Sequence, residues 1–170
     1  MRNGLPLLIA LAASVGIGCR SSAQSATAVD SARSLPSIAV VALDGTATDL
    51  RSVLHGRVAL ISLWATWCDV CVSEIDALAR LQEQAAARND AVVIGVAVGE
   101  TREAIASFAQ KHPLRYSQVV DQDFRLVDAL GEPRVPTTLV IDRGGRIVFR
   151  GGALDSGALA AFRGALGGGP

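Results

Sequence analysis

The chain has 170 residues and a mass of 17.6 kDa, enough for one domain with a substantial hydrophobic core but not for two of equal size. Half of the residues are hydrophobic and 19% are charged, with 16 basic side chains against 16 acidic ones. This composition excludes a disordered chain and a strongly basic protein that binds nucleic acid. The three cysteines are too few for a disulfide-stapled scaffold, and their odd number requires a separate fate for one of them.

Residues 1–18 are expected to form an export signal. Arg2 precedes an apolar run over residues 5–17, which is shorter than the roughly 20 residues that span a bilayer. The run ends at Gly18-Cys19, which resembles a bacterial lipoprotein processing site, although Gly16 stands where that motif prefers leucine. Cys19 is therefore predicted to carry a lipid. The alternative is ordinary signal cleavage nearby, with Cys19 removed or left as a free thiol.

Three further segments follow the signal. Residues 19–36 are rich in serine and alanine and are expected to form a flexible tether. Residues 37–166 carry the periodic apolar patterns of a folded domain, and residues 167–170, Gly-Gly-Gly-Pro, are expected to be a disordered tail.

The first half of the domain alternates strand and helix patterns. Residues 38–43 and 46–49 predict a β-hairpin, because Asp44-Gly45 supplies the positive φ angles of a tight turn. A brief turn over 51–56 leads to the apolar run 58–63, typical of a strand buried on both faces. Helical spacing over 69–87, a second buried strand at 91–98 and a helix from Thr101 towards Pro113 follow, which implies parallel strand pairing.

The second half changes pattern. It shows a short apolar pair at 119–120, a helical patch over 123–130, a strand at 137–141, a turn at 143–145, a strand at 146–150 and a closing helix over 155–166. The predicted fold class is therefore α/β, a central mixed sheet flanked by helices and preceded by the N-terminal hairpin.

Cys68 and Cys71 are the candidate catalytic residues. They lie three residues apart, where a buried strand becomes a helix. Free backbone N–H groups and the positive end of the helix dipole stabilise a thiolate on Cys68, which makes it the attacking thiol. Cys71 lies one turn further on the same face and can act as the resolving thiol.

Two other interpretations of the cysteine pair carry less weight. A structural zinc site needs four protein ligands, and the two histidines, His55 and His112, lie far from the pair in sequence. Two inert core thiols would not require a position at a strand-to-helix junction between flanking tryptophans. A metal ligand set is therefore not predicted, and no cofactor is expected.

The domain resembles the TlpA/ResA-like thiol–disulfide oxidoreductases of bacterial envelopes, which have the thioredoxin fold. The resemblance spans residues 35–166 and rests on the hairpin turn Asp44-Gly45, His55-Gly56-Arg57, the WATWC segment, Glu74 and the VPTTLVID segment over 135–142. It implies that the Val135–Pro136 bond is cis and faces the cysteine pair. A proline that merely opens a strand is the alternative interpretation of Pro136.

The resemblance also implies roles for residues around the cysteines. Val135, Pro136 and Thr137 would bind an extended substrate segment, with the backbone of Val135 pairing with it like an added strand. Glu74 matches the family's cleft glutamate, which assists proton handling, although alone it would be a solvated helix charge. Trp67 is expected to line the site, whereas Trp64 is expected to lie in the core.

The family's known partners define the expected function. Such proteins usually reduce disulfides of protein substrates in an oxidising compartment, for instance the haem-binding cysteines of apocytochrome c, and a membrane redox donor re-reduces them. The chain is therefore expected to be a lipid-anchored reductant in the bacterial cell envelope, facing the periplasm.

The sequence departs from the patterns of related proteins near the cysteine pair. Val70 and Asp76 stand where most relatives have proline, and Ser62 stands where cytoplasmic thioredoxins have a buried aspartate. Asp69 places a negative charge beside the attacking sulfur, so the pKa of Cys68 is expected to be less depressed than in relatives.

Two rival functions use the same cysteines. A peroxiredoxin-like peroxidase shares the fold, but its cysteine usually lies in a Pro/Thr-rich loop assisted by arginine, which residues 67–69 lack. A copper(I)-binding metallochaperone could use the two thiolates, because copper(I) prefers soft sulfur ligands. Such proteins usually add a nearby histidine or methionine, and this chain has neither beside the pair.

Overall fold

The computed structural model describes residues 34–131 and 134–167. The predicted signal, the lipidation site Cys19, most of the tether and residues 168–170 therefore lie outside the described residues. No helix in the described part of the chain is long and apolar enough to cross a bilayer.

Seven strands form one mixed sheet in the order β2-β1-β5-β4-β3-β6-β7. The strands are β1 (Ala39–Ala42), β2 (Ala47–Asp49), β3 (Val58–Trp64), β4 (Ala91–Val98), β5 (Ser117–Asp121), β6 (Thr137–Ile141) and β7 (Ile147–Gly151). β3, β4 and β5 are parallel, and β6 pairs antiparallel with β3. The predicted mixed α/β sheet with its N-terminal hairpin is therefore confirmed.

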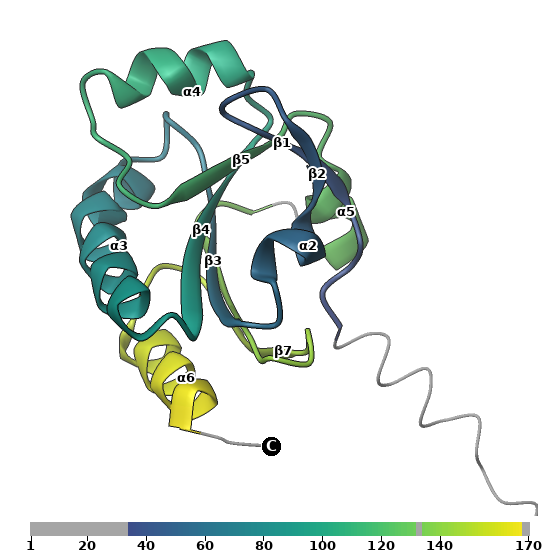
Figure 1. Ribbon diagram of the computed structural model, residues 1–170. Helices are drawn as coiled ribbons and strands as arrows, with labels where there is room; N and C mark the ends of the chain where they lie inside the picture. The colour runs from purple at the N-terminus through teal and green to yellow at the C-terminus, as the bar shows by residue number, and fades with distance from the viewer. Residues whose placement is uncertain (1–33, 132–133, 168–170) are drawn as a thin grey trace, which may run out of the picture.

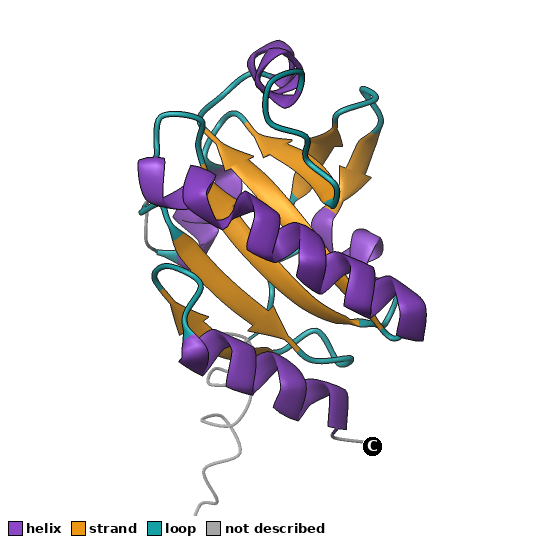
Figure 2. Ribbon diagram, turned by 90° about the vertical axis from the view of Figure 1, so that its left-hand side faces the viewer, coloured by secondary structure: helices purple, strands orange, loops and turns teal. Residues whose placement is uncertain are grey.

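Helices cover both faces of the sheet (Figures 1 and 2). They are α2 (Leu50–Leu54), α3 (Asp69–Arg88), α4 (Arg102–Ala109), α5 (Arg125–Leu130) and α6 (Ser156–Gly167). α3 and α6 lie against one face, α2 and α5 lie against the other, and α4 lies at one end. Gly167, assigned by its sequence to a disordered tail, is the last residue of α6.

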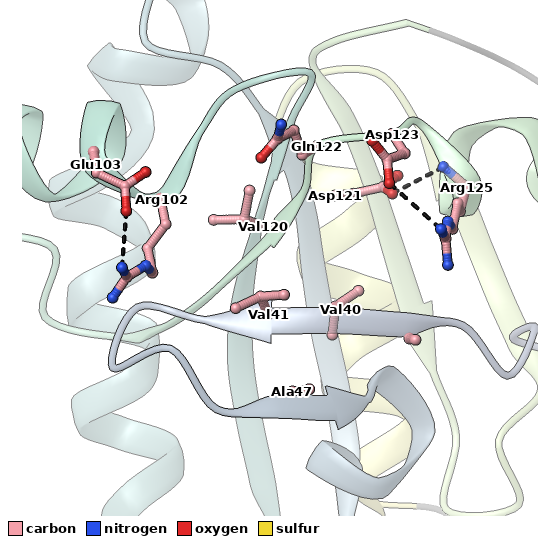
Figure 3. Close-up of a pocket in the computed structure, with 11 residues that line it drawn as sticks. Val40, Val41, Ala47, Arg102, Glu103, Val120, Asp121, Gln122, Asp123 and Arg125 are labelled. Atoms are coloured by element: carbon pink, nitrogen blue, oxygen red, sulfur yellow. Dashed lines mark hydrogen bonds and ion pairs between the residues drawn. The ribbon is translucent and has the colours of Figure 1, made fainter.

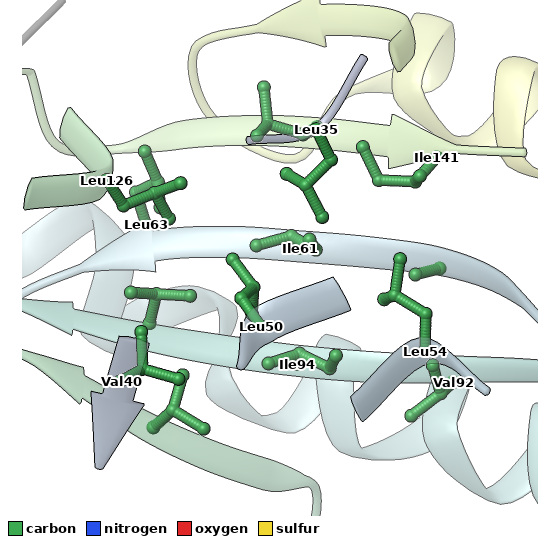
Figure 4. Close-up of a cluster of buried hydrophobic side chains, with 14 of the residues drawn as sticks. Leu35, Val40, Leu50, Leu54, Ile61, Leu63, Val92, Ile94, Leu126 and Ile141 are labelled. Carbon is green, nitrogen blue, oxygen red and sulfur yellow. The ribbon is translucent and has the colours of Figure 1, made fainter. Parts of the chain in front are cut away.

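Alternation along β3 and β4 divides the core into two layers. Ile61 of β3 and Ile94 of β4 pack with Leu50 of α2 and Leu126 of α5 (Figure 4). The intervening residues of the same strands pack against α3 and α6. Because both faces are covered, every residue of β3 and β4 is buried, as their continuous apolar sequences predicted.

The hairpin turn and the following segment differ from their predictions. Of the two turn residues Asp44 and Gly45, only Gly45 has a positive φ, and its N–H donates to Ala42 O. The turn is therefore longer than a two-residue hairpin turn and ends at a glycine with positive φ. The segment 51–56, expected to be a turn, overlaps helix α2, which spans Leu50–Leu54. Asp49 caps this helix by accepting hydrogen bonds from two backbone N–H groups, and the core buries Leu50 and Leu54.

Leu35 belongs to the folded domain, although its sequence context assigned it to the tether. Its side chain is fully buried in the layer beside α2 and α5, and its N–H donates to Gly145 O at 2.9 Å. The folded domain therefore begins before residue 37.

Leu35→Ala should lower the free energy of unfolding by about 2–5 kcal/mol, because it removes a fully buried side chain and leaves a cavity. Val41→Ala, on the 38% exposed Val41 of β1, is the matched control and should cost less than about 1 kcal/mol. Chemical denaturation measures both values. Equal costs for the two variants would show that Leu35 contributes no more than a surface residue.

Candidate active site

Cys68 and Cys71 lie where the chain passes from β3 into α3. Their sulfurs form a disulfide of 2.07 Å, and their Cα atoms are 5.2 Å apart. Cys68 is the N-cap of α3, and its Sγ accepts a hydrogen bond from Cys71 N–H at 3.2 Å. The sulfur of Cys68 therefore occupies the place of a capping oxygen at the positive end of a 20-residue helix.

The two cysteines are buried, but the residues directly beside them, Trp67, Asp69 and Val70, are exposed. Trp67 is 70% exposed and Val70 is 50% exposed, whereas Cys68 and Cys71 pack with Trp64 and Ala65. Trp64 lies in the core as expected and packs against Phe108, with ring centroids 5.5 Å apart. The disulfide is thus flanked by an exposed rim that consists of Trp67, Asp69 and Val70.

Glu100 fixes the loop that leads to Cys68. The Thr66 N–H donates to one Glu100 carboxylate oxygen at 2.8 Å, and the Thr66 hydroxyl donates to the other. Glu100 follows β4, so this contact ties the ends of two parallel strands together. Glu100 has no signature in the sequence, because no local pattern marks the partner of a loop N–H 34 residues away.

The segment before β6 approaches the same cluster. The Val135–Pro136 peptide bond is cis, as the resemblance implied, and Val135 packs against the cluster that contains both cysteines. Thr137 is buried, and its hydroxyl donates to Arg134 O at 2.8 Å. Thr137 therefore braces this segment through its side chain, and its substrate-binding role remains a prediction.

Glu74 lies one turn beyond Cys71 on α3 and is partly buried. Its Oε1 accepts a hydrogen bond from Leu154 N–H at 2.7 Å, a contact between α3 and the segment before α6. Burial raises the pKa of Glu74, and the Leu154 hydrogen bond opposes this shift. Glu74 is therefore not the freely solvated helix charge that its sequence position alone would allow.

A buried hydrogen bond that no sequence motif marks joins β3 and β5. Trp64 Nε1–H donates a hydrogen bond to Gln118 Oε1 at 3.1 Å. The Gln118 side chain lies against Gly95, and a Cβ atom added to Gly95 would fall 2.3 Å from Gln118 Oε1. Burial raises the pKa of Tyr116 to about 12, and the nearby charge of Glu74 acts in the same direction. Among the described residues, Glu74 Oε2 and Gln118 Nε2 are buried side-chain atoms without a hydrogen-bond partner.

The surface also holds a separate pocket of about 420 Å³ between the hairpin and the β5–α5 loop (Figure 3). Its lining includes Val41, Arg102, Gln122 and Asp123, and neither cysteine. Within residues 34–131 and 134–167, no group of three or more His, Cys, Asp or Glu side chains is placed to hold a metal ion.

The fold is that of known thioredoxin-like proteins. A structure described as the thiol:disulfide interchange protein DsbE from Chlorobium tepidum superimposes with a TM-score of 0.71, at 22% identity, over 79% of this chain and 96% of that chain. A secreted thiol-disulfide isomerase from Corynebacterium glutamicum gives a TM-score of 0.65 at 27% identity, over 76% of this chain and 85% of that chain. The chain is therefore a thioredoxin-fold protein with a Cys-x-x-Cys pair at the start of its long helix.

The family follows from the sequence comparison. The Redoxin family model matches residues 30–157, so the chain belongs to the Redoxin family. The thiol-disulfide oxidoreductase ResA of Bacillus subtilis (strain 168) is 28% identical over 97 residues, which cover 57% of this chain and 54% of ResA. The chain thus matches little more than half the length of that relative, and the resemblance to ResA-like proteins is confirmed.

Glu74→Gln tests the electrostatic state of Glu74. Because its folded-state pKa lies above the ordinary value of 4.5, the folded chain binds more protons than the unfolded chain between the two values, and stability falls as pH rises through this window. Glutamine removes the charge and keeps an oxygen for Leu154 N–H. We expect a higher free energy of unfolding than wild type at neutral pH, with the difference shrinking below pH 4.5.

Denaturation curves across the pH range measure this effect. Glu83→Gln, which alters an exposed glutamate on the same helix, is the control and should show no such pH-dependent gain. A Glu74→Gln variant less stable than wild type at neutral pH would contradict the prediction.

Asp69→Asn should lower the pKa of Cys68 in the reduced chain, because it removes a negative charge next to the developing thiolate. Titration of ultraviolet thiolate absorbance measures the pKa, with Asp76→Asn on the same helix as the control. An unchanged or higher Cys68 pKa in Asp69→Asn would refute the idea that Asp69 opposes the thiolate.

Proposed function

We propose that this chain is an exported thiol–disulfide oxidoreductase that exchanges its Cys68–Cys71 pair with protein disulfides. One observation carries the proposal: a bonded cysteine pair caps the start of α3, flanked by an exposed rim and beside the segment that contains cis-Pro136. The name of the relative ResA, thiol-disulfide oxidoreductase, supports the same chemistry.

The reaction has two steps. In the reduced chain the Cys68 thiolate attacks one sulfur of a substrate disulfide, breaks that bond and releases the other substrate sulfur as a thiolate, which takes up a proton. The Cys71 thiolate then attacks Cys68 Sγ, forms the intramolecular disulfide and releases the second substrate thiol. Two electrons pass from the cysteine pair to the substrate, so a dithiol donor must re-reduce the chain.

The residues around the disulfide bind the substrate and transfer protons. The backbone of Val135 pairs with an extended substrate segment and holds its disulfide over Cys68, with Pro136 and Thr137 shaping that segment. Trp67 contacts the bound substrate from the exposed rim. Glu74 is the nearest partly buried carboxyl along α3 and carries protons to and from the buried Cys71.

The proposed direction is reduction, and the proposed compartment is the bacterial cell envelope. Apocytochrome c is a candidate substrate, and a membrane redox protein is the candidate donor. The signal over residues 1–18 would direct export and then be cleaved, and a lipid on Cys19 would hold the domain at the membrane, facing the periplasm. The secreted relative from Corynebacterium supports an extracytoplasmic location.

Cys71→Ser should trap the first step, because without the resolving thiol the substrate stays bonded to Cys68. We expect the reduced wild type to reduce insulin disulfides, Cys68→Ser to lose this activity, and Cys71→Ser to accumulate a mixed disulfide visible by mass spectrometry.

The same three proteins test the rival functions. Hydrogen peroxide turnover that depends on Cys68, without insulin reduction, would identify a peroxidase. Tight copper(I) binding lost in both variants, again without insulin reduction, would identify a metal carrier. Either result would overturn the proposed function.

A further inference from the structure

Arginine side chains gather at the end of the sheet opposite the cysteines. Strand register places three turns at that end: residues 55–57 before β3, residues 88–90 before β4, and residues 142–146 between β6 and β7 (Figure 1). Cys68, in contrast, follows the last residue of β3. We call these turns, with the side chains of Arg51 and Arg163 beside them, the basic end. Its charged residues are Arg51, Arg57, Arg88, Asp90, Asp142, Arg143, Arg146 and Arg163.

Contacts join the parts of the basic end. Arg143 Nη2 lies 3.7 Å from Asp90 Oδ2, and Arg88 pairs with the same carboxylate at 3.4 Å. These two pairs link the β6–β7 turn to the end of α3. The side chain of Arg51 reaches the same turn from α2, because a Cβ added to Gly145 would fall 3.0 Å from Arg51 Nη2.

Helix α6 completes the basic end. Arg143 Nη1 donates to Ala165 O in α6 at 3.5 Å. Arg88 and Arg163 both line a groove of about 330 Å³ between α3 and α6, and the lining also includes Leu159 and Leu166. The basic end thus combines arginine side chains with an apolar groove.

The aspartates of the basic end do not neutralise its arginines. Asp90 pairs with Arg88 and Arg143, and Asp142 pairs with Arg146, so two carboxylates serve three of the arginines. The side chains of Arg88 and Arg146 are each 62% exposed. Within the described part of the chain, the other three arginines form no ion pair; they are Arg51, Arg57 and Arg163. The basic end therefore presents a positive surface to solvent.

The cysteine end of the sheet has the opposite sign. Over residues 65–69, 99–103, 121–125 and 134–136, five carboxylates outnumber three arginines. These residues are Asp69, Glu100, Arg102, Glu103, Asp121, Asp123, Arg125 and Arg134. The charges thus separate along the strand direction, although the whole chain has no net charge. Near an anionic surface, such a domain turns its basic end towards the surface and its cysteines away.

The described chain enters the domain at the basic end. Ser34 forms a β-bridge with Arg146, and Leu35 N–H donates to Gly145 O at 2.9 Å. Ser34 stands 15 residues after Cys19, so even a fully extended segment would span only about 50 Å between them. A lipid on Cys19 would therefore keep the basic end close to the bilayer.

We infer that the basic end docks on the anionic phospholipid headgroups of a bilayer and holds the cysteines away from it. This inference rests on the proposed function, from which it takes the lipid on Cys19. Guanidinium groups bind phosphate through paired hydrogen bonds, and apolar contact in the groove adds to the charge attraction. The arginines come from turns and helix ends of several elements, which suits a layer of headgroups better than one extended acidic peptide.

Sedimentation with lipid vesicles tests the inference. The protein is the chain from residue 19 onward with Cys19→Ser, which carries no lipid and retains every described residue. We expect it to bind vesicles of phosphatidylcholine with about one quarter phosphatidylglycerol, and not vesicles of phosphatidylcholine alone. Binding should weaken steeply as salt screens the charges.

Two triple variants locate the contact. Arg51→Gln, Arg88→Gln and Arg163→Gln together remove three charges from the basic end and should weaken vesicle binding about 100-fold, or about fivefold for each arginine. The matched control removes the same charge elsewhere, through Arg102→Gln, Lys111→Gln and Arg125→Gln, and should weaken binding far less. Both variants should reduce insulin as fast as wild type and keep its melting temperature.

Tryptophan fluorescence reports the orientation on the vesicle. Trp67 is exposed at the cysteine end, and the chain's other tryptophan, Trp64, is buried. Brominated acyl chains quench a tryptophan that enters the bilayer, so we expect no quenching when the domain is bound. Quenching of Trp67 would show that the exposed rim around the cysteines docks instead, and would overturn the inference.

The remaining outcomes are equally decisive. No binding to the anionic vesicles, or equal weakening by the two triple variants, would overturn the role of the basic end. Binding to polyglutamate without binding to vesicles would assign this surface to an acidic protein instead. Vesicle binding by a reduced chain that fails to reduce insulin would overturn the proposed function and leave the docking surface in place.

Discussion

The passage from β3 into α3 is the constraint on which the remaining structure depends. β3 is buried on both faces and paired on both sides, so the point at which the chain leaves the sheet is fixed. The first N–H groups of α3 then require acceptors, and Cys68 Sγ provides one for Cys71 N–H. The reactive sulfur is thus part of the hydrogen bonding that starts the helix, and the site cannot be separated from the fold.

The sheet topology gathers the other site residues at the same end. β3 and β4 are parallel, so Thr66 and Glu100 follow the ends of neighbouring strands. β6 runs antiparallel to β3, so the segment that precedes it, with Val135 and Pro136, reaches that end from the opposite direction. The segments that follow β3 and β4 and the segment that precedes β6 therefore lie at one end of the sheet.

The sequence was sufficient to predict the elements that a local residue pattern marks. Continuous apolar runs located β3 and β4, helical spacing located α3, and the motif located the cysteines. The rest depends on contacts between distant residues. Helix α2 requires the core that buries Leu50, and Leu35 is buried by elements that follow it in the chain. The Glu74–Leu154 hydrogen bond joins residues 80 positions apart, so no local pattern marks it.

The burial of Leu35 has a mechanical consequence. Its N–H is bonded to Gly145 in the β6–β7 turn, which lies near the first residues of β3, whereas Cys68 follows the last ones. The first and last of the seven residues of β3 lie about 20 Å apart. A pulling force applied to the chain before Leu35 would therefore act on the end of the sheet that is remote from the sulfurs. The geometry around Cys68 and Cys71 would be shielded from that tension.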